Sequence, residues 1–159
     1  MRVLVECYHD TALVRALGVP VRSLGHEHGK GNVLLALAKG NGDAVGMVDA
    51  DPGKQNSIPG EMAKYRDRES AHGLTLMGHA ADARKFLVVV GPTLEDWLVA
   101  RAQAAGIRLS DYGLPDSARA LHRIPRYDMR PRFHAFLADL ASDNGMGTLR
   151  KWLTSQRAD

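Results

Sequence analysis

Acidic side chains follow two apolar segments of this sequence, at the points where those segments end. Glu6 closes the first segment, and Asp49 and Asp51 close a later one. Side chains two residues apart in an extended chain project to the same side, so we expect Asp49 and Asp51 to face one region. Asp10 follows Glu6 by four residues, in the first turn of a predicted helix. If the two segments are neighbouring parallel strands, four carboxylates converge at the carboxyl edge of the sheet, where ligands of such sheets bind.

Four carboxylates at one point would repel one another and raise their pKa values, and a divalent cation would remove that conflict. Mg²⁺ (or Mn²⁺) prefers oxygen ligands and takes one or two carboxylates directly. Two such ions about 3.5–4 Å apart would clamp both oxygens of a phosphodiester displacement. There are structural alternatives: the helix dipole favours Asp10 at a helix start, and Asp49 and Asp51 precede Pro52-Gly53, a turn sequence.

The predicted elements alternate in a way that would place these acids together. Strands are predicted at residues 2–6, 21–24, 44–49, 74–77 and 85–90, and helices at residues 9–17, 29–37 and 93–105. Such alternation indicates right-handed crossovers and an α/β fold with a parallel sheet flanked by helices. Residues 52–73 are predicted to be a long loop with at most a short helix at 61–68. The last third is predicted to be helical, so we expect a catalytic domain over residues 1–110 and a helical extension over 111–159 packed on it.

Length and charge set the general class. A chain of 159 residues fits one domain with a genuine core, and no apolar run is long enough to span a membrane. A single cysteine, Cys7, excludes an intramolecular disulfide, so a cytoplasmic protein is expected. The net charge is +3, but residues 119–132 hold five arginines and His122 against one acid, Asp128. This basic segment is suited to the phosphates of nucleic acid, or else to laying arginine stems on apolar surface.

Short motifs in this order resemble the Toprim domain, the Mg²⁺-binding catalytic module of topoisomerases, bacterial primases, recombination proteins and OLD-family nucleases. The motifs are VLVE at residues 3–6, Asp10, LVRALG at 13–18, GKGNV at 29–33 and Asp49-Ala50-Asp51. The likeness is closest to the OLD-type nucleases and covers residues 2–98. It implies a Toprim-like Rossmannoid sheet and a nuclease active site.

The resemblance also implies roles for individual residues. Glu6 would be a metal ligand or general base, and Asp49 and Asp51 would be the metal ligands of the DxD motif. Asp10 would be the additional acid of the OLD type, and Glu95 the later glutamate that serves a second metal. Glu95 also has a simpler explanation, because the helix dipole favours a glutamate in the first turn of a helix.

Lys151 stands at about the place of an OLD-type lysine near the scissile phosphate, although a lysine on an amphipathic helix is more often simply solvated. The chain departs from the family pattern in two places. Cys7 stands where Toprim chains usually have glycine, and Pro52-Gly53 follows the DxD motif without a glutamate after it. These departures argue against a topoisomerase or a primase.

Two glycine-bounded features near the start of the second helix carry weaker signals. His26 and His28 flank Glu27 and suit either a transition metal or a polar turn. The sequence Gly29-Lys30-Gly31 lacks the spacing of a P-loop but offers backbone N–H groups and a lysine to a phosphate.

Three functions follow from these features. The first is Mg²⁺-dependent cleavage or nicking of nucleic acid, with DNA as the expected substrate, a separate ATPase partner by analogy with OLD proteins, and a homodimer as one assembly. The second is a non-catalytic, partner-binding or regulatory subunit of the same fold. The third is a flavodoxin- or receiver-like domain in which Asp49 accepts a phosphoryl group.

Overall fold

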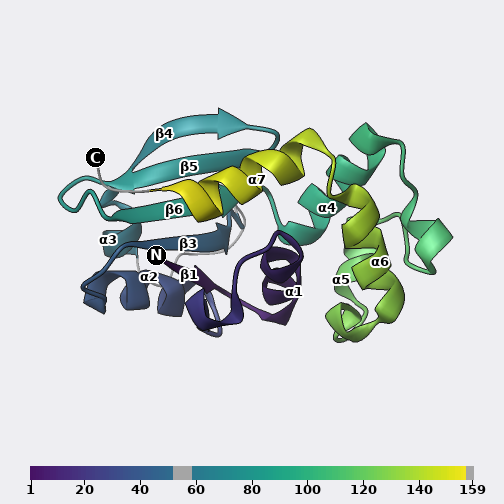
Figure 1. The fold of residues 1–159 in the computed structure, drawn as a ribbon, viewed down its shortest axis with the longest axis horizontal. Helices are drawn as coiled ribbons and strands as arrows, with labels where there is room; N and C mark the ends of the chain where they lie inside the picture. Colours follow the sequence, from purple (N-terminus) through teal and green to yellow (C-terminus); the bar gives the residue numbers. More distant parts are fainter. Residues whose placement is uncertain (52–58, 157–159) are drawn as a thin grey trace.

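The computed structural model describes residues 1–51 and 59–156, and within them six strands form one sheet (Figure 1). The strands are β1 (Arg2–Val5), β2 (Leu24–His26), β3 (Ala44–Asp49), β4 (Tyr65–Ala71), β5 (Leu74–His79) and β6 (Lys85–Val90), in the spatial order β2-β1-β3-β6-β5-β4. The first four strands of this order are parallel to one another. β5 pairs antiparallel with β6 on one side and with β4 on the other. The predicted α/β class is therefore confirmed, with a mixed sheet in place of a wholly parallel one.

Helices cover both faces of this sheet. They are α1 (Tyr8–Ala16), α2 (Lys30–Lys39), α3 (Pro59–Met62), α4 (Leu94–Ala105), α5 (Ala118–His122), α6 (Pro131–Leu140) and α7 (Asn144–Ser155), with 3₁₀ turns η1 (Val21–Ser23), η2 (Leu109–Tyr112) and η3 (Tyr127–Met129). Side chains alternate along β3, so Val45 and Met47 pack with α1, α4, α6 and α7, whereas Val48 packs with α2. Figure 1 shows α1, α4, α5 and α6 gathered at one end of the sheet.

The C-terminal helices share the larger of the two cores. Phe133 of α6 and Trp152 of α7 are buried in the same cluster as Val5 and Val45 of the sheet. The predicted division of the chain at residue 110 stays a prediction. No helix among the described residues is long and apolar enough to cross a membrane.

Three predicted elements differ from the structure. The expected loop contains β4, and the helix expected over residues 61–68 ends at Met62. β4 is an edge strand exposed along most of its length, so it carries no apolar alternation that sequence could reveal. The strand expected at residues 21–24 begins only at Leu24, after a 3₁₀ turn. The part of the expected loop at residues 52–58 lies outside the described residues.

Gly46 in the middle of β3 lets α2 approach the sheet closely. A Cβ atom at this position would lie 2.8 Å from Val33 Cγ1, 2.9 Å from Leu37 Cδ1 and 3.1 Å from Leu87 Cδ1. We expect Gly46→Ala to lower the free energy of unfolding by about 1–3 kcal/mol, because overpacking forces neighbouring side chains to shift. Urea denaturation measures the change. Gly42→Ala, where a Cβ would meet nothing within 4 Å, is the control; equal stability of the two variants would contradict the prediction.

Candidate functional site

The acids predicted at the strand ends meet at the carboxyl edge of β1 and β3. Val5 pairs with Met47 in the sheet register, so Glu6 leaves β1 beside the last residues of β3. The backbone N–H of Asp49 donates a hydrogen bond of 2.6 Å to Glu6 Oε2. The parallel register therefore brings the first and third strand ends together, as the sequence predicted.

Asp10 is held on the same edge by the first turn of α1. Its Oδ2 accepts hydrogen bonds from the backbone N–H and the Sγ of Cys7, both at 3.1 Å, so Asp10 caps the helix whose N-cap is Cys7. The side chain is only 3% exposed. Asp10 thus has the helix-cap role that its position allowed, while lying next to the other acids.

The electrostatics show how closely these carboxylates lie. Burial raises the pKa of Asp10 to about 7, with further increases from the charges of Glu6 and Glu95. Burial also raises the pKa of Asp49 to about 8, and the charges of Asp10, Glu6 and Asp51 add to it. Asp10 therefore lies within electrostatic range of Glu6, Glu95 and Asp49, and Asp49 also lies within range of Glu6 and Asp51.

Glu95 lies in the first turn of α4, which begins after the N-cap Thr93 as predicted. It is buried, and its Oε1 accepts a 3.0 Å hydrogen bond from the Tyr127 hydroxyl. His122 Nδ1 lies 3.3 Å from the same oxygen. Two residues from the C-terminal third of the chain therefore position this acid.

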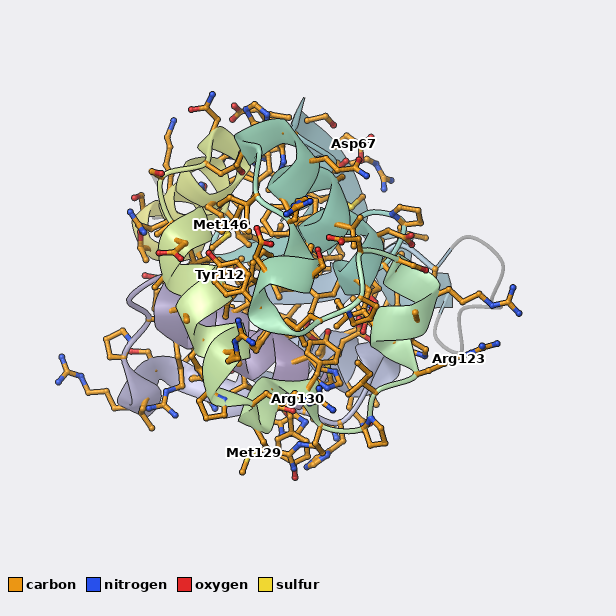
Figure 2. The ribbon with its side chains drawn as sticks, turned by 90° about the vertical axis from the view of Figure 1, so that its right-hand side faces the viewer. Asp67, Tyr112, Arg123, Met129, Arg130 and Met146 are labelled. Atoms are coloured by element: carbon orange, nitrogen blue, oxygen red, sulfur yellow. The ribbon has the colours of Figure 1, made fainter. Side chains whose placement is uncertain are left out.

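Three of these acids, Asp49, Asp51 and Glu95, line a pocket of about 450 Å³, which we call the carboxylate pocket. The basic residues that α5 and its C-cap contribute to its lining are Arg119, His122 and Arg123. Figure 2 looks onto this end of the molecule and labels Arg123 beside α5. The pocket thus has both acidic and basic side chains in its lining.

Lys30 and Tyr127 belong to this site, although the sequence did not assign them to it. Lys30 Nζ donates hydrogen bonds to the carbonyl oxygens of Asp49 at 3.0 Å and Ala50 at 3.2 Å, so this lysine fixes the end of β3. The Gly-Lys-Gly sequence drew attention to Lys30, but it indicated phosphate binding and not these bonds to backbone carbonyls. Tyr127 is buried in the core, and no local pattern connects it with Glu95, 32 residues away.

The structure does not bring Lys151 to the carboxylate pocket. Lys151 lies on α7 and lines a different pocket, of about 550 Å³, together with His72, Asp143 and Arg150. Its role near a scissile phosphate stays a prediction that came from the resemblance alone.

The donor types suit a hard cation, but the residues are not arranged as a preformed cage. Among the described residues, no three His, Cys, Asp or Glu side chains are grouped so that they could hold a metal ion. Mg²⁺ keeps several waters and needs only one or two carboxylates, so the close acids fit it chemically. His26 and His28, with ring centroids 4.0 Å apart, form a ring cluster with Tyr8.

Comparison of the chain with family models, with curated proteins and with solved structures found no match. The Toprim resemblance therefore stays a prediction that depends on the motifs and their placement.

The raised pKa of Asp49 predicts a particular pH dependence of stability. Its pKa is about 8 in the folded protein and near 3.9, roughly, in an unfolded chain. The folded state therefore binds the proton more tightly, and its stability falls as the pH rises from 4 to beyond 8. Without divalent metal, we expect Asp49→Asn to reduce this loss between pH 5 and 9 by on the order of 1–2 kcal/mol. Urea denaturation at both pH values measures it, with the exposed Asp67→Asn as control. Parallel pH profiles for Asp49→Asn and the wild type would contradict the prediction.

The buried hydrogen bond to Glu95 predicts a second effect. We expect Tyr127→Phe to lower the free energy of unfolding by about 1–2 kcal/mol, because it leaves a buried carboxylate without its hydroxyl donor. Thermal and urea denaturation measure the loss. Tyr112→Phe removes a hydroxyl that donates to the carboxylate of Asp139 in an exposed position, and it should cost less than about 0.5 kcal/mol. Equal losses in the two variants would contradict the prediction, because the buried bond to Glu95 would then stabilise the protein no more than the exposed one.

Proposed function

We propose that this protein is a Toprim-like, Mg²⁺-dependent enzyme that cleaves or nicks phosphodiester bonds of nucleic acid, with DNA as the expected substrate. The observation that carries the proposal is the carboxylate pocket, whose lining combines Asp49, Asp51 and Glu95 with arginines of α5 and its C-cap. Acidic oxygens suit a hard cation, and arginine suits a phosphate because its fork of N–H groups matches phosphate oxygens. A metal-assisted phosphodiester reaction needs both kinds of group.

The residues divide by role in this proposal. Asp49, Asp51 and Glu6 would hold the cation, and Asp10 and Glu95 would support a second one. When bound, the cation supplies neutralisation of the developing negative charge and an activated water. The raised pKa values of Asp10 and Asp49 fit this assignment, because a cation would displace the proton that close carboxylates otherwise retain.

The basic side of the pocket would position the substrate. Arg119 and Arg123 line the same pocket as the acids, where each can bind a phosphate oxygen with charge-assisted hydrogen bonds. His122 lies against Glu95, and Tyr127 holds that carboxylate from beneath. A separate ATPase partner and a homodimeric assembly come from the sequence predictions alone and add no contacts to this site.

A non-catalytic, partner-binding or regulatory role is the second candidate. The observations that favour it are the structural uses of two acids: Glu6 accepts the backbone N–H of Asp49, and Asp10 caps α1. In addition, the described residues hold no preformed group of three metal ligands. In such a subunit the fold would persist and any ion would serve structure only.

A plasmid assay separates the two candidates. Supercoiled DNA is incubated with Mg²⁺ or Mn²⁺ and the wild type, Glu6→Gln or Asp49→Asn, with Asp67→Asn on the edge strand β4 as control (Figure 2). We expect metal-dependent nicking that falls at least about 10–100-fold in the two site variants and stays unchanged in the control, because metal sites lose at least this much when a ligand is altered. Equal activity in all four proteins would indicate a contaminant. Absence of nicking together with absence of Mg²⁺ binding in calorimetry would favour the regulatory subunit.

A further inference from the structure

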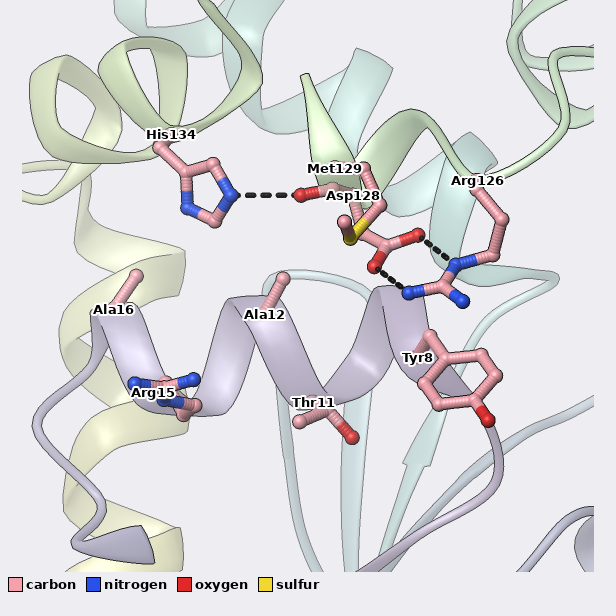
Figure 3. A pocket seen from close by; sticks show the side chains of 9 residues that line it. All are labelled: Tyr8, Thr11, Ala12, Arg15, Ala16, Arg126, Asp128, Met129 and His134. Carbon is pink, nitrogen blue, oxygen red and sulfur yellow. Dashed lines mark hydrogen bonds and ion pairs between the residues drawn. The ribbon is translucent and has the colours of Figure 1, made fainter. Parts of the chain in front are cut away.

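A second pocket, of about 520 Å³, lies between α1 and the segment that holds Arg126, Met129 and His134 (Figure 3). Tyr8, Ala12 and Arg15 line it from α1, at positions four and three residues apart that share one helix face. Asp10, Leu13 and Val14 are the buried residues of the same helix. This α1 pocket is therefore distinct from the carboxylate pocket, although Tyr8 is only two residues from both Glu6 and Asp10.

The shape of the α1 pocket leaves room for a flat group. Ala12 and Ala16 are small and, in Figure 3, point from α1 toward the side of Met129 and His134. Two large apolar side chains at the pocket are unusually exposed: Met129 by 68% and Tyr8 by 44%. A pocket of this volume is in the range, about 300–1,000 Å³, that small-molecule sites occupy.

The charges of the α1 pocket are unequally compensated. The Arg126 guanidinium lies 3.8 Å from the Tyr8 ring centroid and donates hydrogen bonds of 2.9 and 3.0 Å to the two carboxylate oxygens of Asp128. This pair fixes Arg126 as a flat, oriented surface. Arg15 is exposed and has no ion-pair partner among the described residues. Its charge is thus available to an anion.

From this arrangement we propose that the α1 pocket binds one nucleotide, with its phosphate on Arg15 and its base against Met129 and Arg126, whose guanidinium lies on the Tyr8 ring. Bases stack on aromatic rings and on guanidinium planes, and arginine binds phosphate with charge-assisted hydrogen bonds. The proposal rests on the proposed function where the nucleotide is a unit of the substrate strand, since the pocket begins beside Glu6. A free nucleotide is the other source of the same chemistry.

Titration calorimetry in EDTA tests the proposal without cleavage. The probes are adenosine 5′-monophosphate, adenosine, and a single-stranded deoxyadenosine hexamer without terminal phosphates. We expect the wild type to bind the monophosphate or the hexamer, and Arg15→Ala and Tyr8→Ala each to weaken that binding by about tenfold. Tyr8→Phe should retain it, because the ring remains. Arg66→Ala, on the edge strand β4, is the matched control and should bind as the wild type does.

The outcomes show whether the pocket binds a nucleotide and whether that nucleotide is free or part of a strand. Tighter binding of the monophosphate supports a free nucleotide, and tighter binding of the hexamer supports a strand. Absence of binding to both would overturn the proposal, as would equal losses in Arg15→Ala and Arg66→Ala, or adenosine binding as tightly as its monophosphate. Asp49→Asn should keep nucleotide binding even where nicking is lost, so failure of this proposal and failure of the proposed function give different results.

Discussion

The parallel pairing of β3 with β1 and β6 decides where every residue of the candidate site lies. Val5 pairs with Met47, and Asp49 pairs with Val90, so three chain segments leave the sheet at one edge. α1 and α4 begin directly after two of those exits, which is why acids from their first turns reach Asp49. A slip of β3 by one residue would turn Asp49 to the α2 face and separate it from Asp10. The close contact of Gly46 with Val33 and Leu37 of α2 opposes that slip, because a slip would put a larger side chain in the place of Gly46.

The acids at this edge of the sheet lower the free energy of unfolding of the protein. Buried carboxylates that raise each other's pKa cost free energy at neutral pH, and apolar or amide side chains would fit the same positions at lower cost. Asp10 offsets part of its cost by capping α1, and Glu95 by its bond to Tyr127. Asp49 has less compensation from its own hydrogen bonds. Under the proposed function, a bound cation would offset this cost.

The sequence predicted those helices and strands whose pattern of apolar residues matches the side chains that are buried in the structure. The bounds of β3, β6 and α4 match the predicted ranges, because each is an apolar run with a clear terminator or cap. β4 was missed because its exposed edge position leaves no apolar period. The meeting of Glu6, Asp10 and Asp49 was predictable from strand order. Lys30 bonds to backbone carbonyls, and Tyr127 bonds to Glu95. Both contacts depend on tertiary packing between distant segments, which no local pattern encodes.

One short turn lines the α1 pocket and also holds Glu95, an acid that lines the carboxylate pocket. Arg126 adopts a left-handed backbone conformation with φ 49°, an unusual state for a residue other than glycine. This conformation lets Arg126 turn outward over Tyr8 while Tyr127, the next residue, turns inward to Glu95. The ring of His9 stacks on Tyr127 at 3.8 Å, and its Nε2 lies 3.4 Å from Asp128, the carboxylate that orients Arg126. The turn is therefore held from both sides, and the residues that shape the α1 pocket also determine where Glu95 lies in the carboxylate pocket.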